Sequence, residues 1–169
     1  MKLILINGPA GIGKSAVSAR LHAELPQSIL IDVDELRRSI PEYRERRKES
    51  LLLSYEKARE AAAEHLQKGE TVIVDKGISF SETLDSFIEI GRRLGAEVCE
   101  ILLFAAKETL QKRADARGYK PGSLLTRERV GELWDQFDRL RQERPTAVFI
   151  DTTNLTAEET YEHVKRAIE

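Results

Sequence analysis

Short apolar runs alternate along the chain with longer stretches whose apolar positions recur at helical spacing. The apolar runs are Leu3–Ile6, Ser28–Ile31, Thr71–Val74, Val98–Phe104 and Ala147–Ile150. Each run is continuous rather than alternating in polarity, which is typical of strands that are covered on both faces. Strands separated by helices form right-handed βαβ units, so the pattern predicts an α/β fold with a parallel sheet of about five strands flanked by helices.

The helical stretches end at residues that stop helices. The predicted helices are Lys14–Leu25, Asp34–Ile40, Glu42–Lys68, Ser81–Leu94, Lys107–Ala116, Arg127–Arg141 and Ala157–Ile168. Pro26, Gly69 and Gly95 lie where three of them should end. No repeat or linker-like stretch divides the chain, so we expect one domain over residues 1–169. Ligands of parallel sheets bind at the carboxyl ends of the strands, which is where the chemistry should lie.

The segment from Gly8 to Ser15 follows the first strand and precedes the first helix. Its residues are Gly8, Pro9, Ala10, Gly11, Ile12, Gly13, Lys14 and Ser15, which match G-x-x-x-x-G-K-S in the context that this motif requires. Glycines let successive backbone N–H groups turn toward a phosphate, and the helix N-terminus adds partial positive charge. Lys14 reaches the β- and γ-phosphates, Ser15 can ligate Mg²⁺, and Val17 is expected beside the nucleotide. The sequence therefore predicts a single-domain P-loop NTPase fold that binds ATP and Mg²⁺.

Composition narrows the class of partner. Of the 169 residues, 41% are hydrophobic and 33% are charged, and the formal net charge of −2 gives no overall basic field to attract nucleic acid. No apolar run is long enough to span a membrane, and Leu3–Ile6 is too short for a signal peptide. The single Cys99 cannot form an intramolecular disulfide, which indicates a cytoplasmic setting. Nothing in the sequence fixes an oligomeric state.

Asp34 lies just past the second strand, where its carboxylate would be near the phosphate loop. It can accept the proton of a hydroxyl that attacks the γ-phosphate, or it can serve as a helix N-cap, and spacing leaves both interpretations open. Arg37, three residues on, shares the same helical face and could orient Asp34 or hold a substrate. Asp32 is expected to face the other way and to serve structure.

Asp75 follows the third strand, as an acidic residue does in the Walker B pattern that holds Mg²⁺ directly or through water. A polar strand end without function is the alternative, and Asp75 could also contact the substrate. Lys76, Ser79 and Phe80 follow in a loop that we expect to line the pocket of the phosphate acceptor.

Residues 113–126 run from the end of a predicted helix into a loop that contains Gly118, Pro121 and Gly122. Phosphoryl transfer needs cationic donors that close over the γ-phosphate, so this segment is a candidate lid. Arg113 and Arg117 are four residues apart and could point at one ligand, although a solvated basic helix end would have the same spacing. Thr126 is a plausible N-cap of the next helix.

Two further stretches are interpreted as structural. The basic residues between Glu42 and Glu49 alternate with glutamates, which favours a solvated helix face over a nucleic-acid patch. Trp134 and Phe137 are three residues apart on a predicted helix, which favours a place in the core over a platform for stacking bases.

In this order, the motifs resemble those of small P-loop kinases related to chloramphenicol phosphotransferase and to the kinase domain of phage polynucleotide kinase. Zeta-type toxins and gluconate-type kinases share the skeleton. The resemblance rests on Gly8–Ser15, residues 33–37, residues 73–75, residues 112–118 and residues 151–153. It implies that Asp34 is the general base and that Arg117 stabilises the transferring phosphoryl group. It also implies that Arg113 lies near the adenine or the phosphates, and that residues 151–154, with Thr152 and Thr153, border the adenine.

The leading hypothesis is an ATP-dependent kinase that phosphorylates a hydroxyl of a small molecule. In one alternative the acceptor is the 5′-hydroxyl of a nucleoside or polynucleotide, which the resemblance of Arg37 to the arginine after the base in polynucleotide kinase supports. In another, the protein is a switch that hydrolyses ATP to control a partner.

Overall fold

Five parallel strands form one sheet in the computed structural model, which describes residues 1–119 and 125–169. The strand order is β2-β3-β1-β4-β5. The strands are β1 Lys2–Asn7, β2 Ser28–Asp32, β3 Thr71–Asp75, β4 Glu97–Phe104 and β5 Val148–Asp151. The predicted parallel α/β sheet is therefore confirmed. Residues 120–124 of the predicted lid lie outside the described residues.

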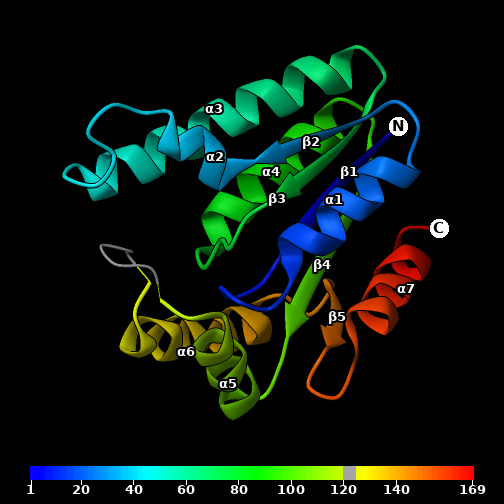
Figure 1. Cartoon of the computed structure of the whole chain (residues 1–169). Helices are drawn as coiled ribbons and strands as arrows, with labels where there is room; N and C mark the ends of the chain where they lie inside the picture. Colours follow the sequence, from blue (N-terminus) through cyan, green and yellow to red (C-terminus); the bar gives the residue numbers. More distant parts are fainter. Residues whose placement is uncertain (120–124) are drawn as a thin grey trace.

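Seven helices in the described part of the chain flank the sheet on both faces (Figure 1). They are α1 Lys14–Glu24, α2 Val33–Arg38, α3 Arg47–Gln67, α4 Ser81–Arg93, α5 Lys107–Arg117, α6 Arg127–Glu143 and α7 Ala157–Ile168. Helices α3 and α4 pack on one face, and α1 and α7 pack on the other. Helices α5 and α6 lie together beyond the end of β4.

The central strand β1 lies between two hydrophobic cores. Leu3 belongs to the core under α3 and α4, whereas Ile4 belongs to the core under α1 and α7, because successive side chains of a strand point to opposite faces. The prediction of cover on both faces holds for β1 but fails at β5, where Val148 and Phe149 are exposed. Since β5 is an edge strand, only one of its two sides pairs with a neighbour.

Helix α3 begins later than predicted. The expected start was Glu42, but residues 41–46 form turns and the helix begins at Arg47. Glu42 has a φ of 56°, a left-handed conformation that a right-handed helix cannot contain. The interpretation of residues 42–46 as a helix face is therefore wrong, although their side chains are largely exposed.

The carboxyl ends of β1, β2 and β3 meet at one edge of the sheet. Asp75 at the end of β3 is in register with Asp32 at the end of β2 and with Ile6 near the end of β1. The phosphate loop leaves β1 at this edge, and the segments after β2 and β3 leave beside it. No helix in the described ranges is long and apolar enough to cross a membrane.

Candidate active site

The loop between β1 and α1 adopts a conformation that only glycine tolerates well. Gly8 has a φ of 146°, and a Cβ atom there would overlap the carbonyl oxygen of Leu103. Gly13 is the N-cap of α1 with a φ of 104°, and no side chain caps this end of the helix. The first backbone N–H groups of α1 therefore have no side-chain acceptor, which suits the binding of an anion.

Two cavities lie on either side of this loop, and Gly11 lines both. The larger cavity has a volume of about 600 Å³ and the smaller one about 410 Å³. Of the predicted site residues, the larger cavity is lined by Ala10, Gly11, Lys14, Ser15, Asp34, Arg37, Asp75, Lys76 and Arg117, and the smaller one by Gly11, Ile12, Gly13, Val17 and Arg113. Ser79 and Phe80, expected in an acceptor pocket, also line the larger cavity.

Lys14 lines the larger cavity and donates a hydrogen bond from Nζ to the carbonyl oxygen of Pro9, at 3.0 Å. Burial lowers the pKa of its ammonium group from 10.5 to about 8, and the nearby carboxylates of Asp75 and Asp34 only partly oppose that effect. A buried cation of this kind gains most from an anionic ligand, because the ligand supplies the missing negative charge.

Ser15 and Asp75 lie together beside Lys14. Burial raises the pKa of the Asp75 carboxyl group, while the neighbouring Ser15 hydroxyl and the charge of Lys14 oppose the rise. A hydroxyl and a carboxylate are hard oxygen donors of the type that Mg²⁺ prefers, so the pair fits that ion.

Asp34 forms an ion pair with Lys76, which follows β3. The Lys76 side chain is only 9% exposed, whereas that of Asp34 is 56% exposed, and both line the larger cavity. Burial raises the pKa of Asp34, but the charge and hydrogen bond of Lys76 and the charge of Lys14 outweigh burial, so the pKa lies below its ordinary value. Asp34 is therefore an ionised carboxylate at neutral pH.

The N-cap of α2 is Asp32, whose Oδ1 accepts a hydrogen bond from the backbone N–H of Glu35, at 3.0 Å. The alternative that Asp34 is the cap is therefore wrong, and the structural role expected for Asp32 is confirmed. One hypothesis was that Arg37 orients Asp34, but the Arg37 side chain does not contact Asp34. Its guanidinium instead donates to Ser50 and to the backbone of Arg47.

Arg113 and Arg117 line different cavities and do not point at one ligand site. Arg113 lines the smaller cavity and donates to Thr152, to Oγ1 at 3.0 Å and to the carbonyl oxygen at 2.7 Å. Arg117, one turn later, lines the larger cavity. Thr152 is fully buried and Thr153 accepts a hydrogen bond from the backbone of Ala106. Neither threonine is among the residues that line these two cavities.

Helix α6 packs beside α5 and contributes residues to the wall of the larger cavity. Thr126 caps this helix by accepting a hydrogen bond from the backbone N–H of Arg129, as predicted. Phe137 is buried and Trp134 packs against both cores, with its indole N–H donating to the carbonyl oxygen of Ala105 at 2.8 Å. Their interpretation as core residues is confirmed, and Phe137 also lines the larger cavity.

Asn7 is a positioning residue that sequence reasoning missed. Its side chain is buried, accepts from the backbone N–H groups of Gly8 and Ile78, and donates to the carbonyl oxygen of Ile78. It thereby fixes the phosphate loop to the loop after β3. A polar residue at the end of an apolar strand is the signal that could have identified it.

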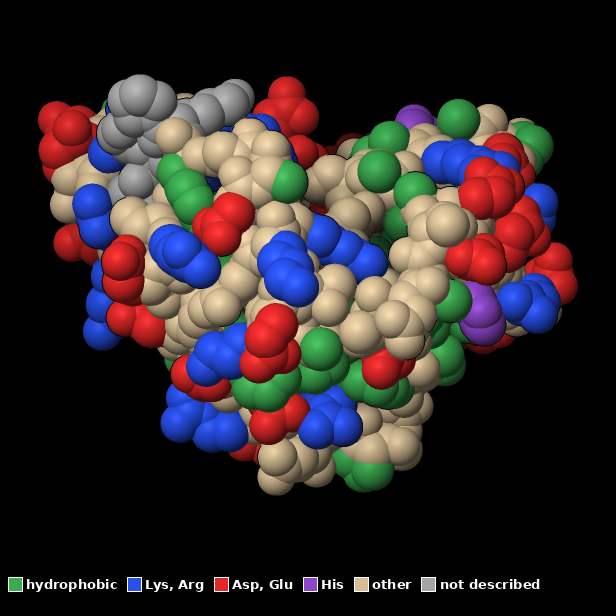
Figure 2. All heavy atoms as spheres, turned by 60° about the horizontal axis from the view of Figure 1, so that its bottom comes forward, with side chains coloured by type: hydrophobic (Ala, Val, Ile, Leu, Met, Phe, Trp, Pro, Cys, Tyr) green, Lys and Arg blue, Asp and Glu red, His purple; other side chains and the backbone are tan. Residues whose placement is uncertain are grey.

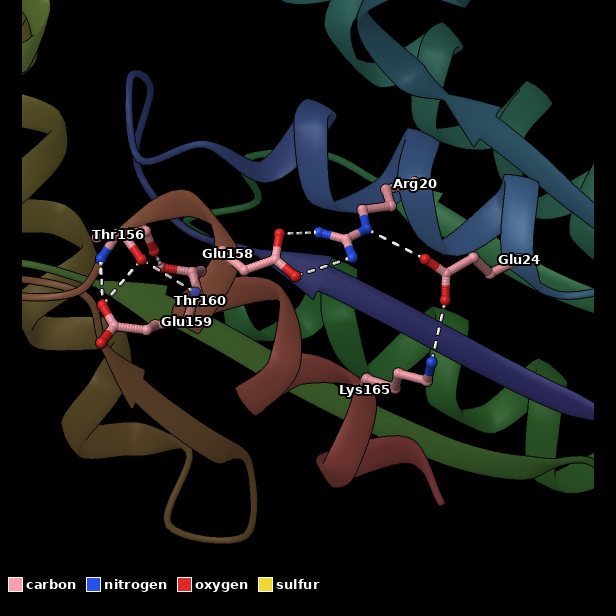
Figure 3. Close-up of polar contacts among 7 residues, drawn as sticks. All are labelled: Arg20, Glu24, Thr156, Glu158, Glu159, Thr160 and Lys165. Atoms are coloured by element: carbon pink, nitrogen blue, oxygen red, sulfur yellow. Dashed lines mark hydrogen bonds and ion pairs between the residues drawn. The ribbon is translucent and has the colours of Figure 1, made fainter.

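A second missed feature connects α1 with α7 beside the smaller cavity. Arg20 lies between Glu158 and Glu24, and Lys165 contacts Glu24 from the other side (Figure 3). The Arg20 guanidinium also stacks over the ring of Tyr161, 3.8 Å from its centroid. Arg20 and Glu158 both line the smaller cavity, and no spacing in the sequence relates them.

More basic than acidic side chains line the larger cavity. Figure 2 shows a notch between two lobes, with Lys and Arg side chains gathered near the centre of that face.

The model of a family of AAA domains, AAA_33, matches residues 3–140 and so covers the phosphate loop, Asp34, Asp75 and both arginines of α5. The chain belongs to the AAA_33 family of P-loop kinases.

Solved structures share the fold of this AAA_33 domain. The Deinococcus radiodurans tunicamycin resistance protein aligns at 20% identity with a TM-score of 0.65, over 99% of this chain and 96% of that one. A gluconokinase from Sinorhizobium meliloti 1021 aligns at 20% identity with a TM-score of 0.70, over 99% and 91%. The Pnkp1/Rnl/Hen1 RNA repair complex contains a chain that aligns at 19% identity with a TM-score of 0.67, over 84% and 45%. The resemblance to small P-loop kinases is thus confirmed, while a comparison with curated proteins finds no match.

Proposed function

We propose that this AAA_33 protein is an ATP-dependent kinase that transfers the γ-phosphate to a hydroxyl of a small molecule. The observation that carries the proposal is that Asp34, an ionised carboxylate, lines the same cavity as Lys14 of the phosphate loop. A cavity of about 600 Å³ accommodates a small acceptor beside the phosphates.

In this mechanism Asp34 accepts the proton of the acceptor hydroxyl as its oxygen attacks the γ-phosphorus. The bond between the γ-phosphorus and the β–γ bridging oxygen breaks, which leaves ADP and a phosphomonoester. Lys14 and Arg117 neutralise charge on the phosphoryl oxygens. Ser15 and Asp75 would hold Mg²⁺, which supplies further charge neutralisation when bound. In the smaller cavity, Arg113 and Val17 would flank the nucleotide base.

The decisive experiment compares two aspartates two residues apart. Asp34→Asn should lower phosphoryl transfer by about 10²–10⁴-fold, because it removes the base, and should leave ATP binding intact. Asp32→Asn is the matched control, since asparagine also caps helices and Asp32 does not line the larger cavity. Transfer is measured by mass shift, with ATP and Mg²⁺, on a panel of sugars, nucleosides, hydroxylated antibiotics and 5′-hydroxyl oligonucleotides.

A Lys14→Ala variant should form no product. If it does, the assignment of the phosphate loop to transfer is wrong. If Asp34→Asn turns over ATP like the wild type and no acceptor is phosphorylated, the protein is an ATP-hydrolysing switch and the kinase proposal fails.

A polynucleotide acceptor is the second candidate, because Arg37 places a guanidinium on the wall of the larger cavity. Phosphate contacts make affinity for nucleic acid fall with salt, so binding of 5′-hydroxyl oligonucleotides should weaken steeply between low and physiological salt. Failure to bind at any salt concentration would remove this candidate.

A further inference from the structure

The larger cavity has a strong excess of positive charge. Among its described lining residues, the basic ones are Lys14, Arg37, Arg38, Lys76, Arg117 and Arg129, and the acidic ones are Asp34 and Asp75. The phosphates of ATP account for the charges of Lys14 and Arg117 in the proposed reaction. The remaining basic side chains of the lining are those of Arg37, Arg38, Lys76 and Arg129.

Three of those four basic side chains have a carboxylate partner. Lys76 pairs with Asp34, and Arg129 pairs with Glu132 at 2.7 Å. Arg38 lies 3.8 Å from Asp32. Their charges are therefore compensated within the protein, at least in part.

Arg37 differs from them, because its partners are neutral. Its Nε donates to the Ser50 hydroxyl at 3.1 Å and one terminal nitrogen donates to the carbonyl oxygen of Arg47 at 2.7 Å. Among the residues that the structure describes, no carboxylate lies within ion-pair distance of it. No described carboxylate therefore pairs with this half-buried guanidinium on the cavity wall.

The Arg37 side chain is also held in place before any ligand arrives. Ser50 is buried, and its hydroxyl oxygen lies within hydrogen-bonding distance of the carbonyl oxygens of Tyr43 and Arg47. Helix α2 places Arg37 one turn after Asp34, so both residues face the larger cavity. A fixed, planar guanidinium with free N–H groups matches the oxygens of a carboxylate or phosphate.

We propose that the acceptor is a small hydroxyl compound that carries a carboxylate or phosphate group, and that Arg37 binds this group. This inference rests on the proposed kinase function and names the class of its substrate. The oxyanion on Arg37 anchors one end of the acceptor, and the hydroxyl to be phosphorylated lies toward Asp34. Tyr43 and Leu51 supply an uncharged wall for the carbon skeleton between them.

The test uses paired acceptors with and without an anionic group: D-gluconate with D-sorbitol, glucose 6-phosphate with glucose, and nucleoside 3′-monophosphates with their nucleosides. Phosphoryl transfer from ATP is measured by mass shift for the full chain. We expect the anionic member of at least one pair to be preferred by tenfold or more in kcat/KM. Arg37→Gln should lower kcat/KM for that member by about 10–100-fold and leave its neutral partner nearly unchanged.

Arg166→Gln, an exposed arginine of α7, is the control and should change neither value. Because Arg37→Gln also breaks the contacts to Ser50, a second measurement uses the wild type alone. With Mg²⁺ and a non-hydrolysable ATP analogue bound, the preferred anionic compound should raise Tm, and its neutral partner should not.

The inference is overturned if neutral members are phosphorylated as well as anionic ones, or if Arg37→Gln lowers both equally. It is also overturned if only oligonucleotides are phosphorylated. In the first two cases the proposed small-molecule kinase survives, and in the last case the polynucleotide acceptor replaces the small molecule. If ATP binds and no compound is phosphorylated, the kinase proposal fails, and this inference fails with it.

Discussion

At the scale of single residues, the site depends on how charges compensate one another. Asp34 and Lys76 pair across the end of the sheet, and Asp75 and Lys14 lie beside them. Each buried cation lowers the cost of ionising a neighbouring carboxylate, and each carboxylate supports a neighbouring cation. Replacing one member of this group should therefore change the titration of the others.

Lys76 should control the titration of Asp34. Lys76→Met removes the charge that outweighs burial, so the pKa of Asp34 should rise, and the acidic limb of the pH profile of kcat/KM should move to higher pH. Carbon-13 NMR of the Asp34 carboxyl measures the pKa without any acceptor. Lys76→Arg keeps the charge and should stay close to the wild type. An unchanged Asp34 pKa in Lys76→Met would contradict the role given to the ion pair.

Lys14 should make ATP binding depend on pH. Its pKa of about 8 means that the free protein loses this charge above that pH, whereas bound phosphates hold the proton. Affinity for Mg²⁺-ATP should therefore fall by up to about tenfold per pH unit above pH 8, with proton uptake on binding. Calorimetry in buffers of different ionisation enthalpy measures that uptake. Lys14→Arg, which stays protonated, should remove the pH dependence, and a wild-type affinity that stays constant from about pH 7 to 9 would refute this account.

At the scale of elements, a helix cap and contacts between helices hold the N-terminus of α7 in place beside the smaller cavity. Helix α7 begins with a capping box, in which the Thr156 hydroxyl accepts from the backbone N–H of Glu159 and the Glu159 carboxylate accepts from the backbone N–H of Thr156 (Figure 3). This end of α7 lies beside the smaller cavity. Arg20 then connects the start of α7 to α1 through Glu158.

Loss of the cap should weaken α7 and the adjoining cavity wall. Thr156→Ala should lower the free energy of unfolding by about 0.5–2 kcal/mol, because it leaves an N–H group of the first turn without its acceptor. Urea unfolding followed by circular dichroism measures the change. Thr156→Ser, which retains the hydroxyl, is the control and should lose much less. Equal losses in the two variants would show that the hydroxyl is not the stabilising group.

At the scale of the whole molecule, one arginine joins three elements far apart in the sequence. Arg144, at the end of α6, forms two hydrogen bonds of 2.9 Å with the Glu100 carboxylate of β4 and also pairs with Asp85 of α4. The Arg144 and Glu100 side chains are each only 10% exposed. This buried pair fixes α6, and with it one wall of the larger cavity, to the sheet.

Arg144→Met should destabilise the fold by about 3–5 kcal/mol, because it leaves Glu100 buried without a counter-charge. Adding Glu100→Gln should recover part of the loss, since the buried charge is then removed as well. Lys68→Met, which breaks an exposed pair with Glu64, is the control and should change stability little. Chemical denaturation measures all three variants. No recovery in the double variant would mean that the loss arises from packing rather than from charge.

Much of the fold and part of the site follow from local patterns. Continuous apolar runs predict buried parallel strands, and the spacing from Gly8 to Ser15 predicts the loop between β1 and α1. Asp34 and Asp75 lie at strand ends, and parallel strands bring their carboxyl ends to one edge. These signals succeed because they depend on backbone geometry and on neighbours in the chain. The helix start at Glu42 was predicted wrongly, because helical spacing does not reveal a left-handed residue.

The sequence by itself determined the parallel sheet, the phosphate loop and the edge where the chemistry lies. Only the tertiary structure decided the partners: Lys76 with Asp34, Asn7 with Ile78, and Arg113 and Arg117 in separate cavities. Spacing in the sequence indicates which residues share a helical face, but not which residues of other elements that face contacts. Partners 42 and 71 residues apart in sequence are brought together by the packing of α2 and of the loop after β3 around the strand ends.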